Sequence, residues 1–223
     1  MLTRATAARP RGFTLIELAV TMAVLALLAV LAVPNLSAWM QNARVRTTAD
    51  LIQDGLRQAQ TEAVKQNRVV AFFLTNTQPT PTSLPAPAAA GSAVKYWYAA
   101  TVPWTTAQLT SNGVTTTSNQ LTMVANGIIS SDAAQVTTTE LSGTIQTLCF
   151  SPYGRLTATS NDPSASPVTC NVPTNTPPLV SYEVAPITAS STAHKLHVTV
   201  SLGGQIRMCD PNKSLSNNAP DGC

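Results

Sequence analysis

The feature that most constrains this chain is an apolar run near its N-terminus that contains a single acidic side chain. Between Phe13 and Val33, the polar residues are Thr14, Glu17 and Thr21 alone. As a helix with a rise of about 1.5 Å per residue, this run would reach about 31 Å, the thickness of a bilayer's hydrocarbon core. A lone carboxylate there costs about 2.5–3.5 kcal/mol, so Glu17 predicts a partner of opposite charge.

Three interpretations of the run compete. A secretory signal has a shorter apolar core and an A-x-A-like cleavage site, whereas this run leads into the sequence Pro-Asn-Leu-Ser at 34–37. A plain membrane anchor leaves Glu17 unexplained. The third interpretation is a processed subunit. The basic residues Arg4, Arg9 and Arg11 precede the run, and the positive-inside rule keeps them in the cytoplasm.

The segment Arg11-Gly12-Phe13-Thr14-Leu15-Ile16-Glu17 resembles the class III leader of type IV prepilins and type II secretion pseudopilins. In that family a membrane-embedded prepilin peptidase cuts after the glycine and methylates the new N-terminal phenylalanine. The resemblance implies cleavage between Gly12 and Phe13 and N-methylation of Phe13. It makes Glu17 the fifth residue of the mature chain and Pro34 the twenty-second, where the family commonly has a helix-kinking proline.

Cleavage would leave a positive amine on Phe13, one helical turn from Glu17. The carboxylate can pair with that amine or with the amine of a neighbouring subunit, and either pairing compensates two charges that hydrocarbon penalises. The pairing between subunits would also set the axial register of an incoming subunit. Glu17 is therefore the predicted assembly residue.

After Pro34 the pattern becomes amphipathic. Apolar residues recur at intervals of three and four, on one helical face: Ala49, Ile52, Leu56, Ala59 and Ala63. We predict a helix from about 13 to about 66, kinked near Pro34 because a proline ring removes one backbone hydrogen bond. The apolar face requires a partner, and we expect a sheet.

The rest of the chain is rich in Thr, Ser, Ala, Pro and Val, and several segments alternate with the two-residue period of a half-buried strand. The candidate strands are 69–74, 93–102, 121–129, 144–150, 179–184, 195–202 and 205–208. The pattern predicts an α+β fold, with a long kinked N-terminal helix packed on an antiparallel sheet, as in type IV pilins.

The predicted organisation has four parts. They are a leader peptide (1–12), a transmembrane and filament-core helix (13–36), the amphipathic half of the same helix (37–68) and a periplasmic β-rich domain (69–223). The resemblance implies a single-pass inner-membrane protein with its C-terminal domain in the periplasm, and a place in a pilus or pseudopilus after assembly.

A second motif narrows the family. Phe150-Ser151-Pro152-Tyr153-Gly154-Arg155 resembles the F-x-P-x-G strand-turn motif of the GspH/FimT group of minor pilins and pseudopilins. By itself the motif is a strand that ends in a Pro/Gly turn, which many folds contain. Together with the leader it points to a FimT/FimU-type minor pilin or a pseudopilin.

The four cysteines lie in the part of the chain that would be exported, where disulfides persist. No C-x-x-C pair is present, so the spacing does not predict a zinc or redox site. Four cysteines allow three pairings. We favour Cys149–Cys170 and Cys209–Cys223, since each closes a loop rich in Pro, Asn and Ser.

The tail at 203–211 resembles the carboxyl end of FimT/FimU proteins, where a G-R-x-R-like strand precedes Cys-Asp-Pro. In competence-associated members the paired arginines contribute to DNA binding. Here Gln205 stands at the position of the first arginine, and Arg207 at the second. Arg207 and Lys213 are the candidate DNA contacts, with Lys195 close in sequence. An ordinary strand with a solvated arginine is the alternative.

Net charge weakens the case for nucleic-acid binding in general. The first twelve residues account for the whole +3, and from Phe13 onward ten basic and ten acidic side chains cancel.

The two histidines, His194 and His197, are three apart in a strand-like segment, which points them to opposite faces. No nucleophile-elbow, P-loop or zinc-protease motif occurs. We predict neither an enzyme nor a cofactor.

Three functional hypotheses remain. The chain is a minor pilin of a type IV pilus priming or tip complex that promotes pilus assembly for twitching motility and adhesion, a GspH-like pseudopilin of type II secretion, or a FimT-like pilin that captures DNA for natural transformation. The implied partners are prepilin peptidase, other minor pilins with the major pilin (or pseudopilins), the inner membrane and, for the third hypothesis, DNA.

Overall fold

The computed structural model describes residues 12–88, 94–102, 121–129, 136–140, 147–158, 168–170, 172–173, 179–186, 194–217 and 219–223. It contains one helix, α1 (Leu15–Gln66), and eight strands within these ranges. The strands are β1 (Val70–Thr75), β2 (Tyr96–Thr101), β3 (Thr122–Ile128), β4 (Val136–Glu140), β5 (Thr147–Phe150), β6 (Leu179–Pro186), β7 (Leu196–Ser201) and β8 (Ile206–Cys209). The chain divides into two compact units, Met1–Met40 and Gln41–Cys223.

Local sequence explains why α1 begins where it does. The hydroxyl oxygen Oγ1 of Thr14 accepts a hydrogen bond from the backbone N–H of Glu17 at 3.3 Å, and the Thr14 carbonyl accepts one from Leu18 at 3.2 Å. Thr14 is thus the N-cap, and Thr-x-x-Glu is the capping-box pattern. The helix begins at Leu15, two residues after the start predicted from the apolar run.

The other end of α1 is closed by an asparagine. Asn67 adopts a left-handed backbone with φ of 50°, and its N–H donates to the carbonyl of Val64. The next N–H, of Arg68, reaches back to the carbonyl of Ala63 at 3.2 Å. These two bonds form a Schellman motif, which satisfies carbonyls that the last turn would leave unpaired. The helix ends at Gln66, as the sequence predicts.

The first unit is apolar and exposed. Phe13 is 87% exposed, and the large apolar side chains that the structure describes as far as Val30 are more than half exposed. Across the part of the chain that the structure describes, no helix is both long and apolar enough to cross a membrane. The membrane assignment of 13–36 therefore stays a prediction.

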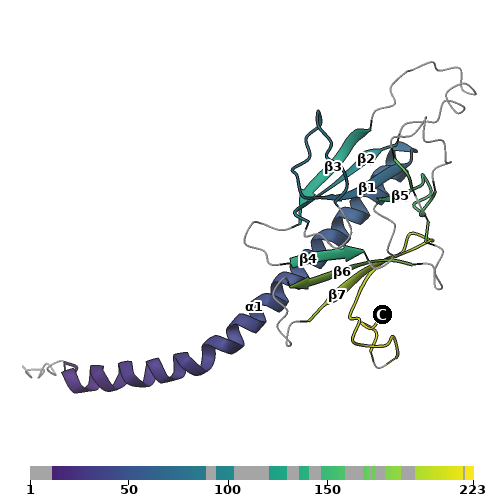
Figure 1. Cartoon of the computed structure of the whole chain (residues 1–223). Coiled ribbons are helices and arrows are strands. Elements are labelled where there is room, and N and C mark those ends of the chain that lie inside the picture. The colour runs from purple at the N-terminus through teal and green to yellow at the C-terminus, as the bar shows by residue number, and fades with distance from the viewer. Residues whose placement is uncertain are drawn as a thin grey trace, which may run out of the picture. The chain divides into compact units, whose positions relative to one another are not determined.

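The strands form two antiparallel sheets, with the orders β3-β2-β1-β5 and β4-β6-β7-β8. Figure 1 shows both sheets beside the second half of α1. The sequence suggested a single sheet. Seven strands correspond to predicted ones, although the predicted starts at 93 and 144 fall outside the described residues. Strand β4 was missed because its sequence, Val-Thr-Thr-Thr-Glu, has no apolar alternation.

The core of the second unit lies between α1 and both sheets. The residues predicted for the apolar helical face are all 0% exposed: Ala49, Ile52, Leu56, Ala59 and Ala63. They belong to one buried cluster with Phe72 and Leu148 of the first sheet and Val198 and Val200 of the second. Burial of a side chain the size of Ile52 contributes about 1.5–3 kcal/mol. The predicted fold, an N-terminal helix packed on antiparallel sheet, is confirmed.

Trp97 is a packing residue of the first sheet. Its ring stacks on Phe72 with the centroids 5.6 Å apart. Two glycines make room for it, since a Cβ atom on Gly55 would lie 2.8 Å from Trp97 Cε2 and one on Gly127 would lie 2.4 Å from Nε1.

A second buried cluster covers the opposite face of the first sheet. Phe73 and Tyr98 stack there with centroids 4.6 Å apart, next to the disulfide between Cys149 and Cys170. The Tyr98 hydroxyl donates to the carbonyl of Pro85 at 2.7 Å. Burial raises the pKa of Tyr98 to about 12, because the phenolate would lose its hydration. Both faces of this sheet are therefore packed.

Candidate functional site

The predicted processing residues lie at the exposed start of α1. A Cβ atom added to Gly12 would meet nothing within 4 Å among the described atoms, and Phe13 is almost fully exposed. Glu17 lies in the first turn of α1 and Pro34 lies within the helix. Cleavage, methylation, the pairing of Glu17 and the kink at Pro34 stay predictions.

A contact that the sequence did not predict joins α1 to both sheets. The side-chain Nε2 of Gln60 donates to the carbonyl of Gly154 at 2.6 Å and to the carbonyl of Gly204 at 2.9 Å. Gly154 follows β5, and Gly204 lies in the hairpin between β7 and β8. We call this contact of Gln60 with the two glycines the Gln60 joint. It fixes one turn from each sheet to the helix.

Backbone geometry explains why both turns use glycine. Gly154 has a φ of 72° and Gly204 a φ of 83°, a left-handed region that other residues adopt at a cost. The N–H of Gly154 donates to the carbonyl of Ser151, and the N–H of Gly204 donates to that of Ser201, both at 2.9 Å. The F-x-P-x-G motif therefore places the Gly154 carbonyl in reach of Gln60. Glycine and proline signalled the turn, but nothing in the sequence signalled its helical partner.

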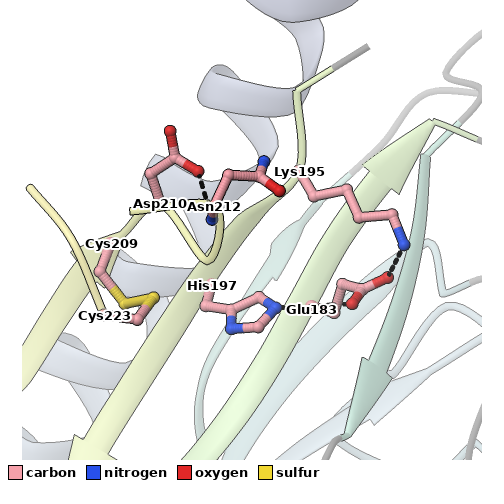
Figure 2. Close-up of polar contacts among 7 residues, drawn as sticks. All are labelled: Glu183, Lys195, His197, Cys209, Asp210, Asn212 and Cys223. Carbon is pink, nitrogen blue, oxygen red and sulfur yellow. Dashed lines mark hydrogen bonds and ion pairs between the residues drawn. A yellow bond between two sulfur atoms is a disulfide. The ribbon is translucent and has the colours of Figure 1, made fainter. Parts of the chain in front are cut away.

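Both disulfides join the cysteines that the sequence favoured, Cys149 to Cys170 and Cys209 to Cys223. The first disulfide lies in the second buried cluster, on the face of the first sheet opposite α1. The second closes residues 210–223, which we call the C-terminal loop. Figure 2 shows this disulfide beside His197, in agreement with the register that places His197 opposite Cys209.

Lys213 is tied into the C-terminal loop by two acids. Its ammonium pairs with Asp221 and lies 3.8 Å from a carboxylate oxygen of Asp210. The hydrogen bond to Asp221 raises the pKa of Lys213, and the same bond lowers the pKa of Asp221. The Lys213 carbonyl accepts a hydrogen bond from Cys223 at 3.0 Å. The charge of this predicted DNA contact is therefore paired with acids of the C-terminal loop.

Two of the other basic residues near the tail contact the same carboxylate. Lys195 lies 3.0 Å from one carboxylate oxygen of Glu183, and His197 Nε2 lies 3.4 Å from the other (Figure 2). His194 does not join this group, and its backbone N–H donates to Asn42 of α1. Glu183 thus contacts two of the basic side chains near the tail. Arg207 donates to the carbonyl of Pro220 at 3.5 Å.

Arg207 also lines a groove between α1 and the edge of the second sheet. The groove has a volume of about 770 Å³, and its walls are α1 on one side and β8 with the C-terminal loop on the other. Within the described residues, no group of three or more His, Cys, Asp or Glu side chains is placed to hold a metal.

Two family models match successive parts of the sequence. Residues 8–33 match the prokaryotic N-terminal methylation motif. Residues 48–204, more than half of the chain, match the family described as type II transport protein GspH. The chain belongs to the GspH family. This GspH-family protein thus has the methylation motif at the start of α1, followed by the family's globular domain.

Structural neighbours of the GspH-family protein include two crystal structures of the type IV minor pilin FimU from Pseudomonas aeruginosa PAO1. Each is 14% identical in sequence, with TM-scores of 0.46 and 0.42. They cover 83% and 80% of this chain and 98% of FimU. None of the curated proteins matches the chain.

The family match ends at Gly204, the last member of the Gln60 joint. The joint is therefore part of the GspH domain, while β8, the second disulfide and the C-terminal loop lie beyond it. Members of the family are structural pilin subunits. In this chain the second half of α1 is hydrogen-bonded through Gln60 to one turn of each sheet.

Proposed function

We propose that this protein is a minor pilin of the type IV pilus that joins a priming or tip complex and promotes filament assembly. The observation that carries the proposal is the continuity of α1, which begins inside the methylation motif and continues into the GspH domain. One helix therefore contains both the predicted processed end and the first part of the GspH domain. In this role the protein is held in the inner membrane by residues 13–36, with its C-terminal domain in the periplasm.

Assembly depends on the charge at Glu17. Prepilin peptidase cuts between Gly12 and Phe13 and methylates Phe13, which leaves a cationic amine. The carboxylate of Glu17, one turn into α1, neutralises this amine or that of the neighbouring subunit in an apolar setting. Thr14 caps the first turn of α1, so the backbone of Glu17 is held in the helix, one turn from the predicted new amine.

The test is a Glu17→Val variant, expressed in cells that have the processing peptidase and a pilus. We expect membrane insertion and removal of the leader to continue, while the variant is lost from sheared filaments. Glu62→Gln removes one acid from the second half of the same helix and is the matched control. Normal incorporation of the Glu17 variant would contradict the proposal, as would a purified wild-type protein that retains Met1.

The description of the matched family favours a second candidate, a pseudopilin of type II secretion. Deletion of the gene separates the two. Loss of surface pili with normal secretion supports the pilus, whereas loss of a secreted enzyme with normal pili supports the secretion system.

The charges give DNA capture no comparable support. Lys213 and Lys195 are each paired with acids, which leaves Arg207 as the one predicted DNA contact outside an ion pair between described residues. A gel-shift with the full chain and Arg207→Ala as control tests this idea.

A further inference from the structure

The groove beside β8 is bordered by a polar stripe of α1. The stripe consists of Asn42, Arg46, Asp50, Gln53 and Arg57, whose spacing of four, four, three and four places them along one face of the helix. Arg46 and Arg57 lie near the two ends. At a rise of about 1.5 Å per residue they are separated by about 16 Å, the length of about five residues of extended chain.

The opposite wall is the edge of a sheet. All four residues of β8, Ile206 to Cys209, line the groove, although consecutive side chains of a strand point to opposite faces. The edge of the strand therefore borders the groove. Strand β8 is the last in the order β4-β6-β7-β8. Just beyond its end, Asp210 and Gly222 of the C-terminal loop form an isolated β-bridge. Such an edge offers backbone N–H and C=O groups to an incoming strand.

Most acids in the groove are paired with a lysine, whereas its arginines form no ion pair between described residues. None of the ion pairs between described residues includes Arg46, Arg57 or Arg207. The groove's acids are Asp50 on the helical stripe and Asp210 and Asp221, which pair with Lys213. Three guanidinium groups thus face a single unpaired carboxylate, which is complementary to an occupant that carries acids of its own.

We propose that this groove binds an extended, acidic segment of another protein chain, which adds to β8 as a further strand and places carboxylates against Arg46 and Arg57. Backbone pairing with an exposed strand edge is an established mode of peptide recognition. The edge favours a polypeptide over DNA, because a nucleic acid has no backbone amide groups to continue a sheet. The inference rests on the proposed function only for its partner, a neighbouring subunit.

The test uses the full chain in detergent micelles and a fluorescent eight-residue peptide of alternating Glu and Val. Anisotropy measures its dissociation constant. We expect the peptide to bind, and the Arg46→Gln/Arg57→Gln double variant to bind it at least about tenfold more weakly. Arg44→Gln/Arg155→Gln is the control, since it removes the same charge from exposed positions outside the groove and should bind normally.

Two further probes test the mode of binding. A peptide with alternate backbone nitrogens methylated keeps its charges but cannot pair with a strand edge, so its binding should be lost. A peptide with Gln for Glu should bind at least about tenfold more weakly. Equal binding by the methylated peptide, no binding by the Glu peptide, or its displacement by a short DNA duplex overturns the proposal. If peptide binding fails while Glu17→Val still blocks incorporation, the proposed function stands without this groove.

Discussion

A Cβ atom added to Gly204 would lie 1.9 Å from the carbonyl oxygen of Gly154, so the two turns meet backbone to backbone. A hydrogen bond also joins the two turns, because the N–H of Leu156 donates to the carbonyl of Leu202 at 3.1 Å. The two sheets are therefore connected through their turns, and Gln60 secures the connection to α1.

Gly204→Ala should destabilise the protein strongly, because it combines a left-handed backbone with a collision against main-chain atoms. We expect a loss of about 2–4 kcal/mol in the free energy of unfolding, measured with urea. Gly203→Ala is the neighbouring control. A Cβ at Gly203 has Ser201 Oγ as its nearest contact, at 3.8 Å, so its effect should stay within about 0.5 kcal/mol. Equal effects for the two variants would contradict the proposed collision.

Gln60→Leu should cost about 1–3 kcal/mol of stability, since it removes two hydrogen bonds at roughly 0.5–1.5 kcal/mol each. The carbonyls of Gly154 and Gly204 would lose their side-chain donor. Gln58→Leu is a matched control, because Gln58 is exposed on the same helix. Urea unfolding compares the two variants. If Gln60→Leu were as stable as Gln58→Leu, the joint would contribute nothing measurable.

Much of the fold could be predicted because it depends on short-range periodicity. The spacing from Ala49 to Ala63 identified the buried helical face, and the alternation in β7 identified a half-buried strand. The division into two sheets depends on pairings between distant segments, which no local pattern encodes. Strand β4 was missed because its threonines carry no apolar signal, and it pairs with β6 through the backbone.

The candidate site was predicted where residue type determines the role, and missed where a partner does. Gly154 belonged to a recognisable turn motif, but its contact with Gln60 depends on the fold. The sequence predicts Lys213 as a candidate DNA contact, whereas in the structure its ammonium pairs with Asp221. Sequence alone gives the charge of a side chain and not the charges that surround it.

Of the two disulfides, Cys209–Cys223 should be reduced first. Cys149 and Cys170 are both buried, at 1% and 0% exposure, whereas Cys223 is exposed at the surface. Thiol exchange requires access of the attacking thiolate to a sulfur atom. Stepwise treatment with dithiothreitol, alkylation and peptide mass mapping will follow the order. Earlier labelling of Cys149 or Cys170 would contradict this order of exposure.

The ion pair between Lys213 and Asp221 should make the C-terminal loop sensitive to both acid and strong base. Since the pKa of Asp221 is lowered on folding, its contribution is complete above the unfolded value near 3.8 and is lost as pH falls through the lower folded value. Since the pKa of Lys213 is raised, that contribution is lost as pH rises above 10.5. Carboxyl NMR titration should show the pKa of Asp221 rising in Lys213→Ala and unchanged in Lys65→Ala.

Tyr98 should give the protein a further loss of stability at high pH. Burial raises its pKa to about 12 from an ordinary value of 10.0, so the folded state holds the phenolic proton more tightly than the unfolded state does. Stability from this group is therefore complete below pH 10 and falls as pH rises towards 12. Absorbance titration of the phenolate near 295 nm measures the shift, and urea unfolding at pH 9 and 11 measures its effect.

Tyr98→Phe gives up the hydrogen bond to Pro85 but should be less sensitive to pH across this interval. Were wild type and Tyr98→Phe to lose equal stability between pH 9 and 11, burial of the hydroxyl would not be the cause.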